Sequence, residues 1–360
     1  MPTSLLRRTV AQLFVVGIPG PELDGPTRDF LTEHPPGGVV LFRRNVRSAG
    51  QLRRLTAALH TSGAGVPPLV SIDHEGGRVD RLPSPFTHFP PAAVVGLHGV
   101  RAAAAVGHAM GIELRTAGID VDFAPVLDVW TNPRNRVIGD RAFATEPERA
   151  ARLALAFARG LQAAGVLACG KHFPGHGAST GDSHFVLPRV TRSRRALRAT
   201  ELVPFVRWIR AGFPAVMTSH VVYPAYDPRR PATLSPRISR DLLRGELGYR
   251  GVLFSDDLEM QAAAGRHPPG RLALRALEAG CDMLLVCQSV ETARAAMQGV
   301  EQALDAGRLD AQVVVGALAR IQRLRAAIAR LRGSASTRFG WPAHARLARR
   351  LTPRAAAPAA

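Results

Sequence analysis

The chain has 360 residues, is 46% hydrophobic and 21% charged, and carries a formal net charge of +19. This balance is typical of a globular protein with a large core, and no apolar run approaches the ~20 residues of a membrane span. The arginines are scattered over nearly every predicted helix and aromatic residues are few, which favours a generally basic surface over nucleic-acid binding.

Eight short apolar runs are the predicted strands, and most of them are continuous rather than alternating. Continuous runs are typical of parallel strands that are buried on both faces. The runs cover residues 12–17, 38–42, 69–73, 121–127, 167–172, 215–220, 251–256 and 282–287. In the first run Gln12 interrupts the apolar stretch and no clean cleavage site follows, so a strand is favoured over a signal peptide.

Helical patterns lie between most of these strands. One covers residues 49–62, with leucines on one face. Another, residues 146–164, begins at a capping box of Thr145 and Glu148 and ends at Gly165. Strands alternating with helices predict an α/β fold, a single (β/α)₈ TIM-like barrel, although strand count alone leaves a doubly wound sheet open.

The predicted catalytic barrel occupies residues 1–333 and includes an extra C-terminal helix, residues 309–332, packed on its outside. Residues 334–360 hold five arginines, no acidic residue and many alanines and prolines, so we expect this tail to be mobile. Three cysteines without disulfide or zinc spacing, Cys169, Cys281 and Cys287, indicate a reduced, cytoplasmic protein.

Lys171 is the only lysine among 47 lysines and arginines. It begins the segment Lys-His-Phe-Pro-Gly-His-Gly, residues 171–177, whose histidines and glycines are unlike a generic exposed surface. Lysine is a compact point charge, whereas arginine is a planar fork. Because the chain uses arginine in place of lysine everywhere else, Lys171 indicates a site that needs the compact ammonium.

Ionisable groups follow most of the predicted strands, at the ends where barrel enzymes keep their active sites. A protein core does not tolerate this many unpaired ionisable groups, so together they indicate a functional site. They are Asp73, Glu75, Asp128, Lys171, His172, Asp182, His184, His220, Asp256 and Asp257.

These motifs resemble those of the glycoside hydrolase family 3 enzymes, and they are most similar to the bacterial single-domain β-N-acetylglucosaminidases that recycle peptidoglycan. The resemblance rests first on residues 171–177, 182–184 and 255–258. Further matching segments cover residues 12–17, 73–78, 123–128, 138–141 and 217–220, in the same order. The resemblance therefore spans roughly residues 10–290.

The resemblance implies a role for each matching residue. Asp256 would be the nucleophile, His184 the general acid and base, and Asp182 the group that orients His184. The sugar-binding positions of the family would be Asp73, Arg81, Arg141, Lys171 and His172. Strand alternation would place Asp257 on the face opposite Asp256, and the family pattern selects Asp256.

A histidine acid is chemically sensible, because its unperturbed pKa of about 6.5 would be raised by a nearby carboxylate. The imidazolium could then protonate a leaving oxygen near neutral pH. Three positions depart from the family pattern: Ala178, Glu259 and His74. None of them removes a proposed catalytic group, so they bear on substrate preference.

The resemblance implies an exo-acting retaining β-N-acetylhexosaminidase that releases N-acetylglucosamine from peptidoglycan fragments in the cytoplasm. We expect no cofactor, no metal, a monomer, a small carbohydrate or muropeptide substrate, and neither nucleic acid nor membrane as a partner. A phosphorylase of the same family stays open, because a neutral histidine base does not repel phosphate. More distant alternatives are a Schiff-base lyase that uses Lys171, a metal-dependent barrel hydrolase and a catalytically inactive binding barrel.

Overall fold

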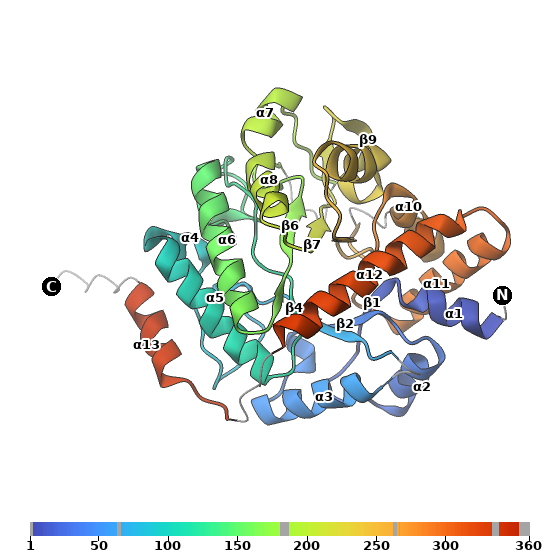
Figure 1. Ribbon diagram of the computed structural model, residues 1–360, viewed down its shortest axis with the longest axis horizontal. Helices are drawn as coiled ribbons and strands as arrows, with labels where there is room; N and C mark the ends of the chain where they lie inside the picture. The colour runs from blue at the N-terminus through green and yellow to red at the C-terminus, as the bar shows by residue number, and fades with distance from the viewer. Residues whose placement is uncertain are drawn as a thin grey trace.

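Parallel strands lie at the centre of the molecule and helices surround them (Figure 1). The computed structural model describes residues 3–62, 66–180, 187–261, 265, 267–332 and 338–352. The strands are β1 Phe14–Gly17, β2 Gly38–Leu41, β3 Leu69–Ile72, β4 Val121–Asp122, β5 Leu167–Ala168, β6 Gly170–Phe173, β7 Ala215–Thr218, β8 Val222–Tyr223, β9 Asp227–Pro231, β10 Val252–Phe254 and β11 Leu284–Val286. The α-helices are α1 Thr3–Ala11, α2 Gly25–Glu33, α3 Ala49–Thr61, α4 Ala92–Leu97, α5 Gly99–Thr116, α6 Pro147–Ala163, α7 Arg194–Ala199, α8 Leu202–Arg210, α10 Pro269–Ala279, α11 Val290–Asp305, α12 Ala311–Leu331 and α13 Pro342–Leu351.

The strands form two parallel sheets and one antiparallel hairpin. The sheets have the orders β11-β1-β2-β3-β4-β5 and β10-β7-β6, and the hairpin is β8-β9. Isolated parallel bridges join Val126 to Lys171 and Phe254 to Met283. All eight predicted strand regions are confirmed; the fifth is split at Cys169 into β5 and β6. The fold is therefore α/β with mostly parallel strands, and closure into a barrel stays a prediction.

The predicted helix at residues 146–164 is confirmed as α6, but its predicted cap is wrong. The side chain of Glu146, rather than Thr145, accepts hydrogen bonds from the backbone N–H groups of Glu148 and Arg149. A carboxylate at this position has two oxygens and so satisfies two N–H donors of the first turn. At the other end, Gly165 has φ = +93°, a conformation that favours glycine.

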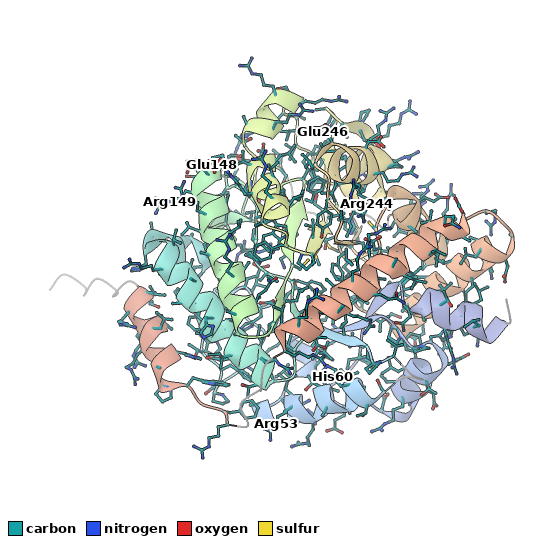
Figure 2. All side chains as sticks on the ribbon, viewed as in Figure 1. Arg53, His60, Glu148, Arg149, Arg244 and Glu246 are labelled. Carbon is teal, nitrogen blue, oxygen red and sulfur yellow. The ribbon has the colours of Figure 1, made fainter. Side chains whose placement is uncertain are left out.

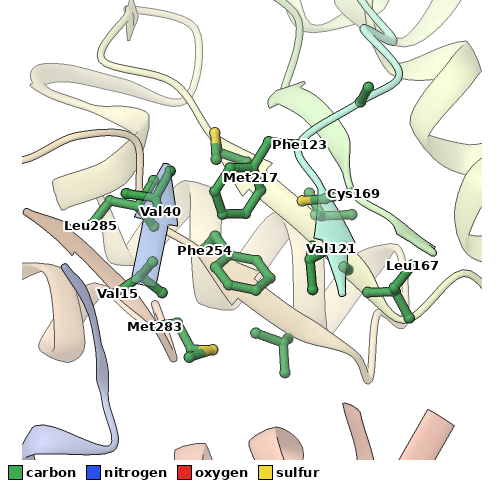
Figure 3. Close-up of a cluster of buried hydrophobic side chains, with 14 of the residues drawn as sticks. Val15, Val40, Val121, Phe123, Leu167, Cys169, Met217, Phe254, Met283 and Leu285 are labelled. Atoms are coloured by element: carbon green, nitrogen blue, oxygen red, sulfur yellow. The ribbon is translucent and has the colours of Figure 1, made fainter. Parts of the chain in front are cut away.

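Apolar side chains from the strands of both sheets meet in one buried cluster (Figure 3). The rings of Phe123 and Phe254 pack edge to face, with 5.3 Å between centroids. Val15, Val121 and Met283 lie beside them and are at most 2% exposed. This cluster fills the space between the strands, which leaves the strand ends to carry the polar residues.

Helix α12 crosses the amino ends of the strands. Arg325 donates to the backbone oxygens of Gly37 and Pro67, the residues that lead into β2 and β3. Arg320 on α12 and Arg244, which lies beside this helix in Figure 2, both bind the buried carboxylate of Asp282. The amino ends are thus closed by the chain itself. Among the described helices, none is long and apolar enough to cross a membrane.

Part of the tail differs from its prediction, while its residues 334–337 and 353–360 lie outside the described residues. Residues 342–351, expected to be mobile, form helix α13. The ring of Trp341 packs 5.7 Å from that of Phe86, and His344 pairs with the buried Glu113 on α5 at 2.7 Å. These few anchoring side chains outweigh the basic, alanine-rich composition on which the prediction rested. The domain boundary at residue 333 stays a prediction.

Candidate active site

A cavity of about 790 Å³ lies where the strands end. Its lining includes residues that follow β3 and β10 as well as residues of β6. Six of the eight predicted site residues line it together: Asp73, Arg81, Arg141, Lys171, His172 and Asp256. The other two, Asp182 and His184, fall within residues 181–186 and lie outside the described residues.

Lys171 lies at the floor of the cavity and is 2% exposed. Its Nζ lies 2.5 Å from Oδ1 of Asp73 and 2.8 Å from Oε1 of Glu75. Burial lowers the pKa of Lys171, but these two carboxylates outweigh burial and hold that pKa above its usual value. Lys171 is therefore a fixed, protonated ammonium.

Glu75 connects Lys171 to Arg141. Arg141 donates Nε to Oε2 of Glu75 at 2.8 Å and Nη2 to Oε1 at 2.7 Å, a two-pronged pair. Burial raises the pKa of Glu75, but Arg141 and Lys171 bring it well below its usual range. Glu75 is ionised and fully engaged, so it is a poor candidate for a general acid.

Asp128 holds the two histidines of the Lys171 segment. Its Oδ2 lies 2.7 Å from Nδ1 of His172, and its Oδ1 accepts the backbone N–H of His176 at 2.6 Å. Because Asp128 accepts at Nδ1, the Nε2 atom of His172 is left to face the cavity and Arg141, at 3.5 Å. Burial lowers the pKa of His176 to about 4, so that ring is neutral.

Asp256 follows β10 and accepts the backbone N–H of Asp257 at 2.9 Å. Its own N–H donates to Oγ1 of Thr218 at 3.2 Å. Burial raises the pKa of Asp256, but the His220 and His172 rings, the N–H of Asp257 and Lys171 together lower it below its usual value. Within the described chain no lysine or arginine forms an ion pair with Asp256, so an ionised carboxylate remains available to a ligand.

The predicted opposition of Asp256 and Asp257 rests on strand alternation, and both residues line the cavity. Strand β10 ends at Phe254, so the alternation of strand side chains no longer applies to them. Oδ1 of Asp257 accepts the N–H groups of Glu259 and Cys287. Burial and the adjacent Glu259 and Asp256 carboxylates raise the pKa of Asp257 to about 7, despite those two hydrogen bonds. The two neighbours therefore have different chemistry.

The departures from the family pattern have local contacts. His74 is buried and its Nδ1 accepts the backbone N–H of Arg81 at 3.3 Å. Glu259 accepts the N–H of Gln288 at 2.5 Å and lines the cavity. Ala178 packs against the core. Among the described residues, no three His, Cys, Asp or Glu side chains are placed to hold a metal ion, so the metal-dependent alternative has no candidate ligand set there.

Comparison with known proteins identifies the family of this site. The family model for the glycosyl hydrolase family 3 N-terminal domain matches residues 5–324. The chain belongs to glycosyl hydrolase family 3. It is therefore a glycoside hydrolase, and the cavity at the strand ends is its candidate active site.

Individual relatives agree with this membership. The chain is 45% identical over 291 residues to a protein of Alkalilimnicola ehrlichii named Beta-hexosaminidase, covering 79% of this chain and 83% of the relative. A protein of the same name from Methylococcus capsulatus is 43% identical over 286 residues, which are 78% of this chain and 84% of that protein.

Solved structures are similar as well. A family 3 β-N-acetylglucosaminidase from Paenibacillus sp. str. FPU-7 superposes with a TM-score of 0.91 at 39% identity, covering 96% of this chain and 68% of that one. NagZ from Neisseria gonorrhoeae, solved in complex with N-trifluoroacetyl-D-glucosamine, has a TM-score of 0.74 at 36% identity, covering 89% and 96%. Both similarities extend over most of this chain.

Proposed function

We propose that the chain is an exo-acting retaining β-N-acetylhexosaminidase that releases terminal N-acetylglucosamine by double displacement. The observation that supports this most is Asp256, a carboxylate without a cationic partner in the described chain, in the cavity that also holds the expected sugar-binding residues. Relatives named Beta-hexosaminidase, and a similar structure in complex with an N-acylated glucosamine, support the sugar class.

In the proposed first step, a carboxylate oxygen of Asp256 attacks the anomeric carbon while the bond to the leaving oxygen breaks. His184 donates a proton to that oxygen, and Asp182 orients the imidazole. The lowered pKa of Asp256 keeps it ionised at neutral pH. In the second step, neutral His184 takes a proton from water as the water attacks the anomeric carbon, and Asp256 leaves as a carboxylate.

The buried ion pairs hold the sugar-binding groups before substrate arrives. Glu75 fixes both Lys171 and Arg141, and Asp128 fixes His172. Donors held in this way need little reorganisation during the reaction, which is how enzymes gain most from electrostatic stabilisation. Glu75 and Asp128 are therefore positioning residues in this proposal.

We extend the proposal to the natural substrate and compartment. Peptidoglycan fragments that end in N-acetylglucosamine are the expected substrates, cleaved by a monomer in the cytoplasm. The basic composition of the chain, with a net charge of +19, suits such anionic fragments. The three buried, unpaired cysteines are compatible with a reducing compartment.

Closure of the two sheets into one (β/α)₈ barrel is also proposed. The Phe254–Met283 and Val126–Lys171 bridges support it. The backbone N–H of Ser255 donates to Met283 at 2.8 Å and that of Lys171 donates to Pro125 at 3.2 Å, which continues the pairing on both sides. A crystal structure with an unbroken ring of such hydrogen bonds would establish closure.

Phosphorolysis is the second candidate, since phosphate could replace water in the second step. The Schiff-base alternative finds no support, because imine formation needs a neutral amine and Lys171 is held protonated by two carboxylates.

The direct test compares a chromogenic β-N-acetylglucosaminide with the matching β-glucoside, each with and without inorganic phosphate. We expect strong preference for the N-acetyl substrate, free N-acetylglucosamine as the product and no effect of phosphate. Sugar 1-phosphate as the main product would replace hydrolysis by phosphorolysis. Turnover of the β-glucoside alone would contradict the proposed sugar class.

The roles of Asp182 and His184 have a separate test. With a good phenolate leaving group, His184→Ala should release a burst of product and then turn over slowly, because no base activates water. Added azide should restore turnover, since it needs no base. Asp182→Ala should show a weaker form of this pattern. Equal loss with good and poor leaving groups, without a burst or rescue, would make His184 a binding residue.

A further inference from the structure

Arg81 is fixed in a different way from two other cations of the cavity. Lys171 and Arg141 both pair with the carboxylate of Glu75, at 2.8 and 2.7 Å. Arg81 lines the same cavity, but its guanidinium forms no ion pair within the described chain. Its buried Nε has no hydrogen-bond partner there either. The position of the Arg81 side chain therefore depends on the backbone that carries it.

That backbone belongs to a loop, residues 80–91, which leads from the cavity to α4 and contains no helix or strand. The backbone N–H of Arg81 donates to Nδ1 of His74 at 3.3 Å, a long hydrogen bond. Oδ2 of Asp80 lies 2.6 Å from Nδ1 of His88, which joins the start of the loop to its far part. A displacement of the loop near His88 would therefore be transmitted to Arg81.

Aromatic side chains that are distant in sequence cover the middle of this loop. Phe86 is 3% exposed, and its ring centroid lies 5.8 Å from that of Phe339 and 5.7 Å from that of Trp341. The rings of Phe339 and Trp341 also pack edge to face, at 6.0 Å. Such aromatic pairs add to the stability that burial of the rings supplies. Removal of the Trp341 ring would leave a void beside Phe86, so the loop would lose part of its support.

A buried carboxylate joins the same two segments. Oε2 of Glu113 on α5 accepts the backbone N–H of Thr87 at 2.7 Å, and Oε1 lies 2.7 Å from Nδ1 of His344 on α13. Helix α13 packs beside α5 (Figure 1), and the backbone oxygen of its Leu351 lies 3.0 Å from Nε2 of His98. The loop and the segment around α13 are therefore fixed relative to each other.

We propose that the segment of residues 339–344 positions Arg81 for substrate binding by holding the loop of residues 80–91. Its positioning side chains are Phe339, Trp341 and His344, none of which lines the cavity. This role rests on the proposed sugar-binding function of Arg81. A misplacement of about 1 Å can greatly reduce activity, so side chains outside the cavity can control a group within it.

The test is a double-mutant cycle between Trp341 and Arg81. The variants are Trp341→Ala, Arg81→Ala and the combination of both, and Trp341→Phe is the conservative variant. If Trp341→Ala does not fold, His344→Ala takes its place in the cycle. The matched control is Arg349→Gln/Arg350→Gln, which changes exposed side chains of α13.

Two quantities are measured at a temperature where every variant is folded. The first is the KM and kcat for a chromogenic β-N-acetylglucosaminide. The second is backbone hydrogen exchange, which needs no turnover and reports the loop itself.

We expect Trp341→Ala to raise KM by roughly 5- to 20-fold and to change kcat by less than about 2-fold, because the contacts of Asp256 are retained. Trp341→Phe and the control should stay within about 2-fold of the wild type. In the Arg81→Ala background, Trp341→Ala should have no further effect on KM. Hydrogen exchange should become faster in residues 80–89 and stay unchanged in α6.

The same factor in KM in both backgrounds would overturn the proposal, since Trp341 would then act independently of Arg81. Unchanged exchange in residues 80–89 would overturn it as well. Absence of turnover in the wild type would instead contradict the proposed function, and the exchange measurement would still decide whether the segment holds the loop.

Discussion

Carboxylates lie at both ends of the parallel strands, and the side chains around them differ. At the amino ends, Asp282 is bound by Arg244 and Arg320, and Asp120 by Arg332 and His60. At the carboxyl ends, Asp256 lines the cavity, accepts the N–H of Asp257 and donates its own N–H to Thr218, and it forms no ion pair with a described lysine or arginine. A carboxylate whose cationic partners come from the chain itself stabilises the fold, whereas a carboxylate without such a partner is available to a substrate.

A second contrast lies within the carboxyl end itself. Asp256 and Asp257 are neighbours and both are half-buried, yet the pKa of Asp256 lies below its usual value and that of Asp257 is raised to about 7. His220, His172 and Lys171 surround Asp256, whereas Asp257 faces further carboxylates. Neighbouring charge, rather than burial, therefore decides which of the two is the available anion.

The largest effect is expected when the carboxylates of Asp256 and Asp257 are neutralised one at a time. Asp256→Asn should lower kcat by about 10⁴-fold or more, because it removes the proposed nucleophile. Asp257→Asn should lower it by only about 10-fold, since it removes a loop contact. Steady-state kinetics on purified, folded protein measure both. A dead Asp257 variant beside an active Asp256 variant would reverse the assignment.

Lys171→Arg tests whether the carboxyl-end network needs its compact ammonium. The larger fork cannot take the place of a 2%-exposed Nζ that lies 2.5 Å from Asp73 and 2.8 Å from Glu75. We expect kcat/KM to fall by about 10²-fold, with a raised KM, even though the charge is kept. An unchanged KM would mean that the lone lysine is an accident of composition.

Loss of the Asp282 ion pairs at the amino ends should lower stability and leave activity unchanged. Asp282→Asn leaves two largely buried arginines without their carboxylate, so the free energy of unfolding should fall by about 3 kcal/mol. At temperatures where the variant is folded, kcat/KM should match the wild type. Urea denaturation and kinetics on the same sample test this. A large kinetic loss would show that the two ends are not independent.

A further effect concerns pH. Because the folded pKa of Asp257 is raised to about 7, the folded state holds a proton that the unfolded state has released. Its contribution to stability is greatest below the unfolded pKa of about 3.9 and decreases as pH rises to about 7. Asp257→Asn should therefore gain stability relative to the wild type between pH 4 and 7. Urea titrations across that range measure the gap, and a constant gap would contradict the raised pKa.

The strand pattern was predictable because each buried strand is a continuous apolar run. The hairpin β8–β9 was not, since its Asp-Pro-Arg-Arg-Pro strand has neither apolar runs nor alternation. Helix α13 was not predicted, because Trp341 and His344 anchor it through partners that are distant in sequence.

The part of the site around Lys171 was predictable, because its residues are adjacent in the sequence. The residues that hold the site in position were not predictable. Asp128 and His172 are 44 residues apart, and no local sequence motif predicts the 2.7 Å contact between Oδ2 of Asp128 and Nδ1 of His172. Glu75 was visible in the sequence as one of the ionisable groups at the strand ends, yet its ion pairs with Lys171 and Arg141, which hold these two cations in place, were not. Contacts between strand ends require the fold before they can be assigned.

Asp256 is the proposed nucleophile of a retaining glycosidase. A fluorinated N-acetylglucosaminyl fluoride that reacts quickly and is released slowly should trap the covalent intermediate. Digestion and tandem mass spectrometry should then find the sugar on Asp256 alone. Label on Asp257 or Glu75, or full turnover with no label on any carboxylate, would contradict the account.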